Sequence, residues 1–156
     1  GGILYYKTKN YEKAKESLLI AANDENNTTL VRETAWVTLC SMMEEISSYN
    51  DASIYYRQLI EMSPKVENYK LYGAFSYRRL QYNDAIYSYN EALNIATDKK
   101  DMFEINLALG KCYYRMNELD NAEESYRNAL SYNGGDSQAK EGLKQVMAKK
   151  QLIYNK

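Results

Sequence analysis

The chain has 156 residues, of which 45% are hydrophobic, and its 20 basic and 21 acidic side chains leave a net charge of −1. This composition is sufficient for a hydrophobic core, and the balanced charge gives no overall attraction to nucleic acid or to an anionic membrane. Histidine is absent from the sequence, which excludes triads, zinc sites and acid–base chemistry that depend on imidazole.

A repeated motif is the strongest signal along the chain. A small residue of a first helix falls at Gly2, Cys40, Gly73 and Gly110, and a small residue of a second helix always follows twelve positions later, at Ala14, Ala52, Ala85 and Ala122. Around each of these small residues, apolar and small residues recur three and four positions apart, which is the period of a helix with one buried face. Each unit is therefore predicted to be a pair of helices.

In chain order, we predict a partial repeat over residues 1–27, complete repeats over 28–64, 65–100 and 101–134, and a capping helix over 135–156, all in one domain. Gly2 stands where the middle of a first helix belongs, so the chain is expected to be the C-terminal part of a longer array. Asn and Asp side chains between the paired helices are expected to cap the second helix of each complete repeat. These are Asn50, Asp51, Asn83, Asp84, Asp120 and Asn121.

The last predicted helix has one apolar face and a charged remainder. The apolar face is formed by Ala139, Leu143, Val146 and Met147. Lys149 and Lys150 fall among the charged residues on the other side, where we expect contact with water. A terminal helix with a polar outer side is what a stacked repeat array requires at its end.

The motif strongly resembles the tetratricopeptide repeat, whose consensus runs Trp-x2-Leu-Gly-x2-Tyr, then Ala-x3-Phe, then Pro. The residues that carry the resemblance are Trp36, Leu39 and Pro64 in one unit, and Leu109, Gly110, Tyr113, Ala122 and Tyr126 in another. The departures are Cys40 for Gly, Ser76 for Tyr, and Tyr56, Tyr89 and Tyr126 for Phe. The resemblance covers nearly the whole chain and implies an all-α fold, a right-handed superhelical solenoid of helix-turn-helix repeats closed by the capping helix.

Close packing is the role expected of the recurrent small residues. Gly73 and Gly110, facing Ala85 and Ala122, would let the paired backbones approach closely. The tyrosines at positions 56, 89 and 126 are expected to fill the space toward the next repeat.

In proteins of this family, the first helices line a concave groove, and this implies a binding surface. The residues that we expect in the groove are Lys70, Tyr77, Arg78, Lys111, Tyr114 and Arg115, with Val37 and Ser41 at the neutral end in the second repeat. Tyr and Arg are frequent in binding hot spots, so the hypothesis is a groove for a partner peptide or helix with acidic residues. A second interpretation stays open: one Tyr of each Tyr-Arg pair packs on a neighbouring helix, and the Arg is a solvated charge that complements the helix dipole.

We therefore predict a non-catalytic protein-binding adaptor or scaffold without a cofactor or metal. The alternative is a structural subunit that self-associates, or packs inside a large assembly, through the ends and edges of the solenoid. Nucleic acid and membranes are not expected as partners. Chaperone C-terminal tails are not expected either, because Ser41 and Ala74 replace an Asn that family members use to bind them.

Two further features bear on chemistry and location. The acidic pairs Glu44-Glu45 and Glu123-Glu124 are adjacent, so on a helix their side chains point about 100° apart and cannot share a proton. Cys40 and Cys112 stand far apart within helical patterns, which is typical of buried free thiols in a reduced compartment. Together with the lack of a signal-peptide pattern, this predicts an intracellular, cytoplasmic protein.

Overall fold

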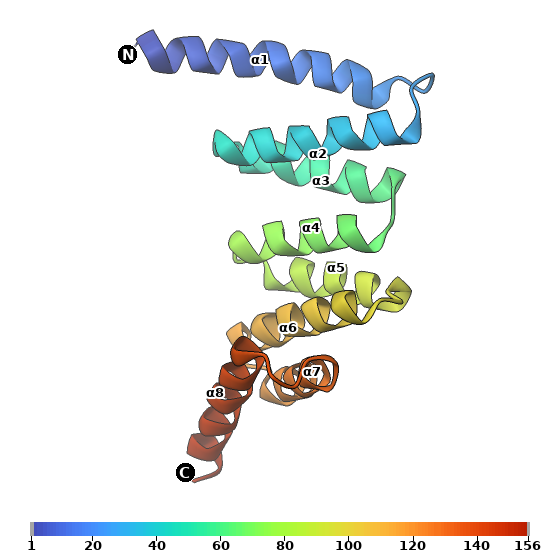
Figure 1. Ribbon diagram of the computed structural model, residues 1–156. Coiled ribbons are helices and arrows are strands. Elements are labelled where there is room, and N and C mark those ends of the chain that lie inside the picture. Colours follow the sequence, from blue (N-terminus) through green and yellow to red (C-terminus); the bar gives the residue numbers. More distant parts are fainter. Residues whose placement is uncertain (1, 156) are drawn as a thin grey trace. The chain divides into compact units, whose positions relative to one another are not determined.

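The computed structural model describes the backbone of residues 2–155 and the side chains of residues 10–155. Within these residues the chain forms eight helices and no strand (Figure 1). They are α1 (Gly2–Asn23), α2 (Thr29–Glu45), α3 (Tyr49–Met62), α4 (Val66–Arg78), α5 (Tyr82–Ile95), α6 (Lys99–Arg115), α7 (Leu119–Tyr132) and α8 (Ser137–Tyr154). The prediction of an all-α fold is confirmed. None of the described helices is both long and apolar enough to cross a membrane.

The helices fall into two compact units, one ending at Pro64 and one beginning at Lys65. The first unit contains α1 to α3, and the second contains α4 to α8. In both, each helix packs on its neighbour in the chain, with the extensive contacts α2 to α3, α4 to α5 and α6 to α7 joining the two helices of a repeat. The predicted repeat boundaries, and the prediction that the chain forms one domain, stay predictions.

The first repeat differs from its predicted form. A turn was expected ahead of Ala14, whereas α1 runs without a break from Gly2 to Asn23. Ala14 is exposed, although Ala52 and Ala85 at the matching positions are fully buried. The residues before Ala14 continue along the same helix axis, so no antiparallel helix within the repeat covers it. The burial of Gly2, predicted as the matching small residue of a first helix, lies outside what the structure describes.

Three turns of one geometry join the paired helices. Ser47, Leu80 and Asn117 each have a φ close to 60°, in the left-handed region. In the turn after α4, the N–H of Gln81 donates to the carbonyl of Ser76 over 2.8 Å, and the N–H of Leu80 donates to the carbonyl of Tyr77 over 3.0 Å. The same pair of bonds recurs in the other two turns. This is the Schellman motif, which satisfies the last carbonyls of a helix and explains the constant interval between the small residues.

The expected side-chain caps do not form. The helices after these turns begin at Tyr49, Tyr82 and Leu119, and the residues ahead of them make no side-chain cap hydrogen bond. The Asn and Asp residues predicted as caps therefore lie inside the first turn. The prediction was wrong because the Schellman motif makes the turn short. The second helix therefore begins before the Asn and Asp residues, which leaves them inside it and not at its N-cap.

Leu80 is the least suitable residue in these turns, because a non-glycine side chain in the left-handed region is strained. Its side chain is 64% exposed, so little packing would be lost on its removal. We expect Leu80→Gly to raise the free energy of unfolding by about 0.5–1 kcal/mol, measured by urea denaturation. Asn117→Gly is the matched control and should change less, since Asn tolerates this conformation. A loss of stability in Leu80→Gly would contradict this account of the turn.

Glycine permits close packing of aromatic rings against helices in the second unit. A Cβ added to Gly73 would lie 2.7 Å from the ring of Tyr89, and one added to Gly110 would lie 2.8 Å from the ring of Tyr126. The ring of Tyr126 also lies against Gly142 of α8. Tyr89 and Tyr126 thus pack on the glycine of their own repeat, and Tyr126 also meets the following helix as predicted.

Two serines in the core of this unit have different environments. The hydroxyl of Ser88 donates to the carbonyl of Tyr69 over 2.6 Å and so links α5 to α4. Ser76, which stands where the consensus has Tyr, is also fully buried, but its Oγ has no hydrogen-bond partner among the described residues. An unpaired buried hydroxyl reduces stability. Serine in place of the consensus tyrosine at position 76 therefore leaves a polar group unsatisfied in addition to being smaller.

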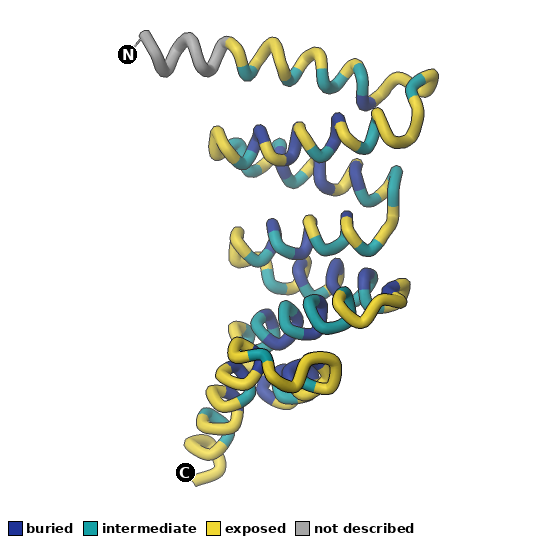
Figure 2. The backbone as a smooth tube through the Cα atoms, viewed as in Figure 1, coloured by how far each residue is buried: buried dark blue, intermediate teal, exposed yellow. Residues whose placement is uncertain are grey.

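α8 packs on α6 and α7 as the predicted capping helix, but not with all the predicted residues. Much of α8 is coloured as exposed in Figure 2; among its predicted apolar residues, Ala139 and Val146 are fully buried, whereas Met147 is 39% exposed. Lys150, predicted to face water, instead has only 16% of its side chain exposed and forms ion pairs with Asp120 of α7 over 2.6 Å and Glu123 of α7 over 2.8 Å. The prediction for this lysine was wrong because carboxylates on α7 attract its charge.

Candidate functional site

Two adjoining cavities of the second unit contain residues that the sequence predicted for a binding surface. The large cavity has a volume of about 610 Å³ and is lined from α4, α6, α7 and α8. The small cavity has a volume of about 240 Å³ and is lined from α4, α5 and α6. Tyr77 and Lys111 line both, so the cavities adjoin one another. We call the two together the α4–α6–α8 groove.

Five of the residues predicted from the sequence meet in this groove. Lys111, Tyr114 and Arg115 of α6 line the large cavity together with Tyr77 of α4. Arg78 of α4 lines the small cavity. The helical period explains the convergence, because positions three and four apart share a face of α4 or of α6.

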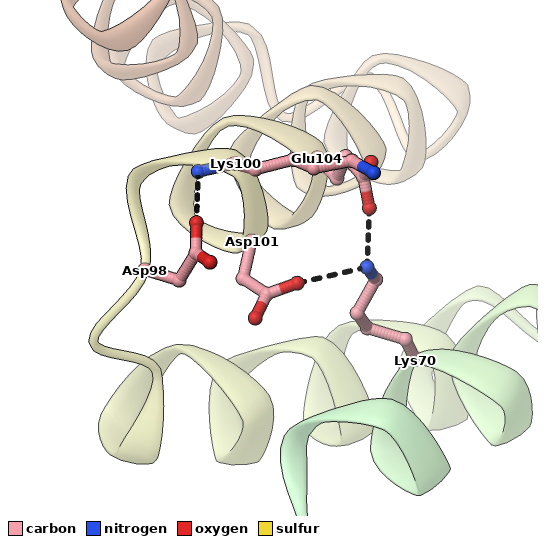
Figure 3. Close-up of polar contacts among 5 residues, drawn as sticks. All are labelled: Lys70, Asp98, Lys100, Asp101 and Glu104. Atoms are coloured by element: carbon pink, nitrogen blue, oxygen red, sulfur yellow. Dashed lines mark hydrogen bonds and ion pairs between the residues drawn. The ribbon is translucent and has the colours of Figure 1, made fainter.

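Lys70 lies elsewhere. Its Nζ lies 3.2 Å from a carboxylate oxygen of Asp101 and also pairs with Glu104, so it joins α4 to α6 (Figure 3). Asp98, beside this network, caps α6 by accepting from the N–H of Lys100 over 2.7 Å. Desolvation lowers the pKa of the Lys70 ammonium, but its hydrogen bonds to Glu104 and Asp101 outweigh this effect and leave the pKa above its ordinary value. Lys70 lines neither cavity, although its partner Glu104 lines the small one.

The predicted neutral end belongs to the first unit. Val37 is half-buried and Ser41 is exposed, both on α2. Neither lines the large or the small cavity.

Tyr77 and Arg115, one residue from each Tyr-Arg pair, are held by contacts within the chain. Tyr77 packs against the buried core of α5 and α6, and its ring meets that of Tyr82 edge-on at 5.6 Å between centroids. Arg115 lies in the last turn of α6, donates from Nε to the hydroxyl of Tyr82 over 3.0 Å, and stacks near the same ring. Desolvation raises the pKa of Tyr77, which therefore stays a neutral phenol. Both side chains are therefore packed and at the same time line the large cavity.

α8 supplies groove residues that sequence reasoning missed. Gln138, Glu141, Gly142 and Gln145 line the large cavity. The amide oxygen of Gln138 accepts from Nζ of Lys111 over 2.9 Å. The available signal was Gly142, since glycine in a helix interior costs about 1 kcal/mol relative to alanine unless a close contact requires it.

The charges around the groove are mixed, with a basic excess. Arg78, Lys111 and Arg115 are its cations, and Glu104 and Glu141 are its acids. Glu104 is already paired with Lys70. Three cationic side chains therefore stand beside two carboxylates, one of which is already paired.

The buried thiols are not placed for chemistry. Cys40 and Cys112 are both free and buried, as the sequence predicts. Burial raises the pKa of Cys112 to about 12, so it remains a thiol at neutral pH. Within the described residues, no group of three or more Cys, Asp or Glu side chains is arranged to hold a metal ion.

Comparisons with known proteins agree on one kind of fold. Residues 103–136 match the family model for the tetratricopeptide repeat. The N-terminal domain of stress-induced protein-1 from C. elegans has a similar structure, with a TM-score of 0.69, 16% identity, and coverage of 78% of this chain and 99% of that one. The Sgt2 TPR domain from Aspergillus fumigatus reaches a TM-score of 0.67 at 19% identity over 80% of this chain and 82% of that one.

The MamA protein is similar over a larger part of this chain. Its TM-score is 0.69 at 19% identity, with 97% of this chain and 79% of that one covered. No curated protein matches the sequence significantly. The helical architecture and the matched repeat nevertheless agree with one another: residues 103–136 match the tetratricopeptide repeat, and the chain has the all-α fold of tetratricopeptide-repeat domains.

Proposed function

We propose that the second unit is a non-catalytic binding module that holds an acidic segment of a partner protein in the α4–α6–α8 groove. The tetratricopeptide-repeat fold supports a role in protein–protein interaction in general. The finer proposal rests on one observation, the convergence of Tyr77, Lys111, Tyr114 and Arg115 on the large cavity.

The chemistry of these side chains suits a peptide better than a small reactive substrate. Tyrosine contributes a large contact area with little rotamer freedom to lose, and arginine offers a fork of donors to a carboxylate. Both residues recur at the energetic centre of protein interfaces. An adaptor or scaffold needs these properties and no nucleophile.

The first test is selection of a displayed library of random nine-residue peptides on the full chain. We expect enrichment of Asp and Glu, affinity that falls as salt is added, and loss of binding in the double variant Arg78→Glu with Arg115→Glu. Lys140→Glu with Lys144→Glu is the charge-matched control, because both lysines are exposed on α8 and line neither cavity. Equal binding by the two double variants would overturn the proposal.

Self-association is a second candidate, favoured by the apolar end of α8. Leu152, Ile153 and Tyr154 are 68%, 51% and 76% exposed. If they mediate assembly, the mass measured by sedimentation velocity should rise with concentration and should not respond to the Arg78→Glu with Arg115→Glu change. A constant mass over the accessible concentrations would exclude this role for the chain alone.

A further inference from the structure

The two cavities differ in size and lining, and from this difference we infer a binding preference within the function proposed above, on which the inference rests. We propose that the preferred segment places an aromatic side chain in the large cavity, a small aliphatic side chain in the small cavity, and a carboxylate between them at Lys111.

The large cavity suits an aromatic ring. Tyr77, Tyr114 and Tyr126 reach it from three different helices, and its volume is about 610 Å³. Aromatic pairs prefer edge-on and offset contacts, which rings from several directions can provide. Gln138 and Gln145 at its α8 side can hydrogen-bond the polar tip of a tyrosine or tryptophan.

The small cavity suits a short aliphatic side chain. Ala74 of α4 and Leu107 and Ala108 of α6 form apolar parts of its lining, and its volume is only about 240 Å³. Its acid, Glu104, is held by Lys70 and so is directed to the protein's own lysine. An aliphatic side chain the size of valine would gain apolar contact there without removing a charge from water.

Lys111 marks the boundary between the two. It lines both cavities, as does Tyr77. Its Nζ donates to the neutral amide of Gln138, and Nε of Arg115 donates to the neutral hydroxyl of Tyr82. Neither of these bonds neutralises a positive charge, so a carboxylate of the ligand placed between the cavities gains two cationic partners.

Three single variants of the full chain separate the parts of this preference. Gln145→Trp places a ring in the large cavity, Ala74→Leu fills the small cavity, and Lys111→Met removes the charge between them. The reagent is the same displayed library of random nine-residue peptides, followed by synthetic peptides of the enriched sequences measured by fluorescence anisotropy. Gln151→Trp is the control for the first variant, because this exposed residue of α8 lines neither cavity.

On the wild-type chain, we expect enriched peptides in which an aromatic and a small aliphatic residue flank an Asp or Glu. Each of the three variants should weaken such a peptide about tenfold, the loss of one strong side-chain contact, while Gln151→Trp leaves its affinity unchanged. Gln145→Trp should abolish the selection for aromatic residues and keep that for acidic ones. Lys111→Met should abolish the selection for acidic residues and keep that for aromatic ones.

The results that would contradict the two-cavity preference differ from those that would contradict the proposed function. If acidic peptides are enriched without an aromatic residue, and Gln145→Trp binds them as the wild type does, the two-cavity preference is wrong while acidic binding stands. If no acidic peptide is enriched, or none depends on Arg78 and Arg115, the proposed function is wrong and the inference falls with it. Circular dichroism of each variant identifies any loss that arises from unfolding.

Discussion

Replacing Gly110 with leucine is expected to lower the free energy of unfolding of the chain by about 3 kcal/mol, because the new side chain has no room. Even a Cβ at this position would lie 2.8 Å from the ring of Tyr126, whose side chain is only 4% exposed and cannot move into solvent without losing its own packing. Urea denaturation followed by circular dichroism measures the change.

Two further variants make this prediction specific. Gly134→Leu is the matched control, since Gly134 is exposed in the connection between α7 and α8 and its Cβ would meet only a backbone oxygen at 3.4 Å. It should change stability by less than about 0.5 kcal/mol. Tyr126→Leu should recover part of the loss when combined with Gly110→Leu, because the two sites share one contact. Additive effects would mean that the ring of Tyr126 does not limit position 110.

Reversing the charge of Glu123 should release α8. Glu123 lies between Lys150 of α8 and Arg127 of its own helix, with Nζ of Lys150 at 2.8 Å and Nε of Arg127 also at 2.8 Å. The variant Glu123→Lys would place three cations together and repel the helix that caps the unit. We expect the amides of α8 to exchange with solvent ahead of those of α6 and α7, as measured by hydrogen–deuterium exchange with mass spectrometry.

The neighbouring Glu124→Lys serves as control, because Glu124 is exposed. It changes the net charge equally without touching Lys150. If both variants accelerate exchange in α8 to the same extent, the docking of α8 does not depend on the Lys150 ion pairs.

The same ion pairs give the docking of α8 a pH dependence with a definite sign. Hydrogen bonds from Lys150 and Arg127 hold the pKa of Glu123 below its ordinary value of about 4.3, so its contribution is present above that value and is lost as pH falls through the lowered pKa. Asp120 and Glu123 raise the pKa of Lys150 above its ordinary value of about 10.4, so its contribution is lost only as pH rises through the raised pKa. Exchange protection of α8 should therefore be constant near neutrality and fall at both extremes.

Much of the helical architecture could be predicted from residue identity. The spacing of Gly73 and Ala85, repeated at Gly110 and Ala122, identified the repeat, because glycine and alanine are needed wherever two helix backbones approach closely. Both cysteines were predicted to be buried and free, and they are. The groove positions on α4 and α6 followed from the helical period together with the family's groove.

The ends of the chain were predicted less well. The first repeat was expected to turn before Ala14, yet α1 continues through that point. α8 was expected only to cover an apolar end, yet Gln138, Glu141 and Gln145 form one wall of the large cavity. The structures of α1 and α8 depend on which helices pack against them. The residue pattern within each of the two segments does not contain that information.

The period of small and apolar residues was sufficient to predict the helices, their pairing and the repeat fold, because these depend on local spacing and on side-chain size. The partners of the charged residues were decided by packing between distant segments. Lys70 meets Asp101 from 31 positions away, and Lys150 meets Glu123 from 27 positions away. Such pairs form only after helix crossing has placed the two surfaces together, and a charge in a linear sequence does not specify which opposite charge it will meet.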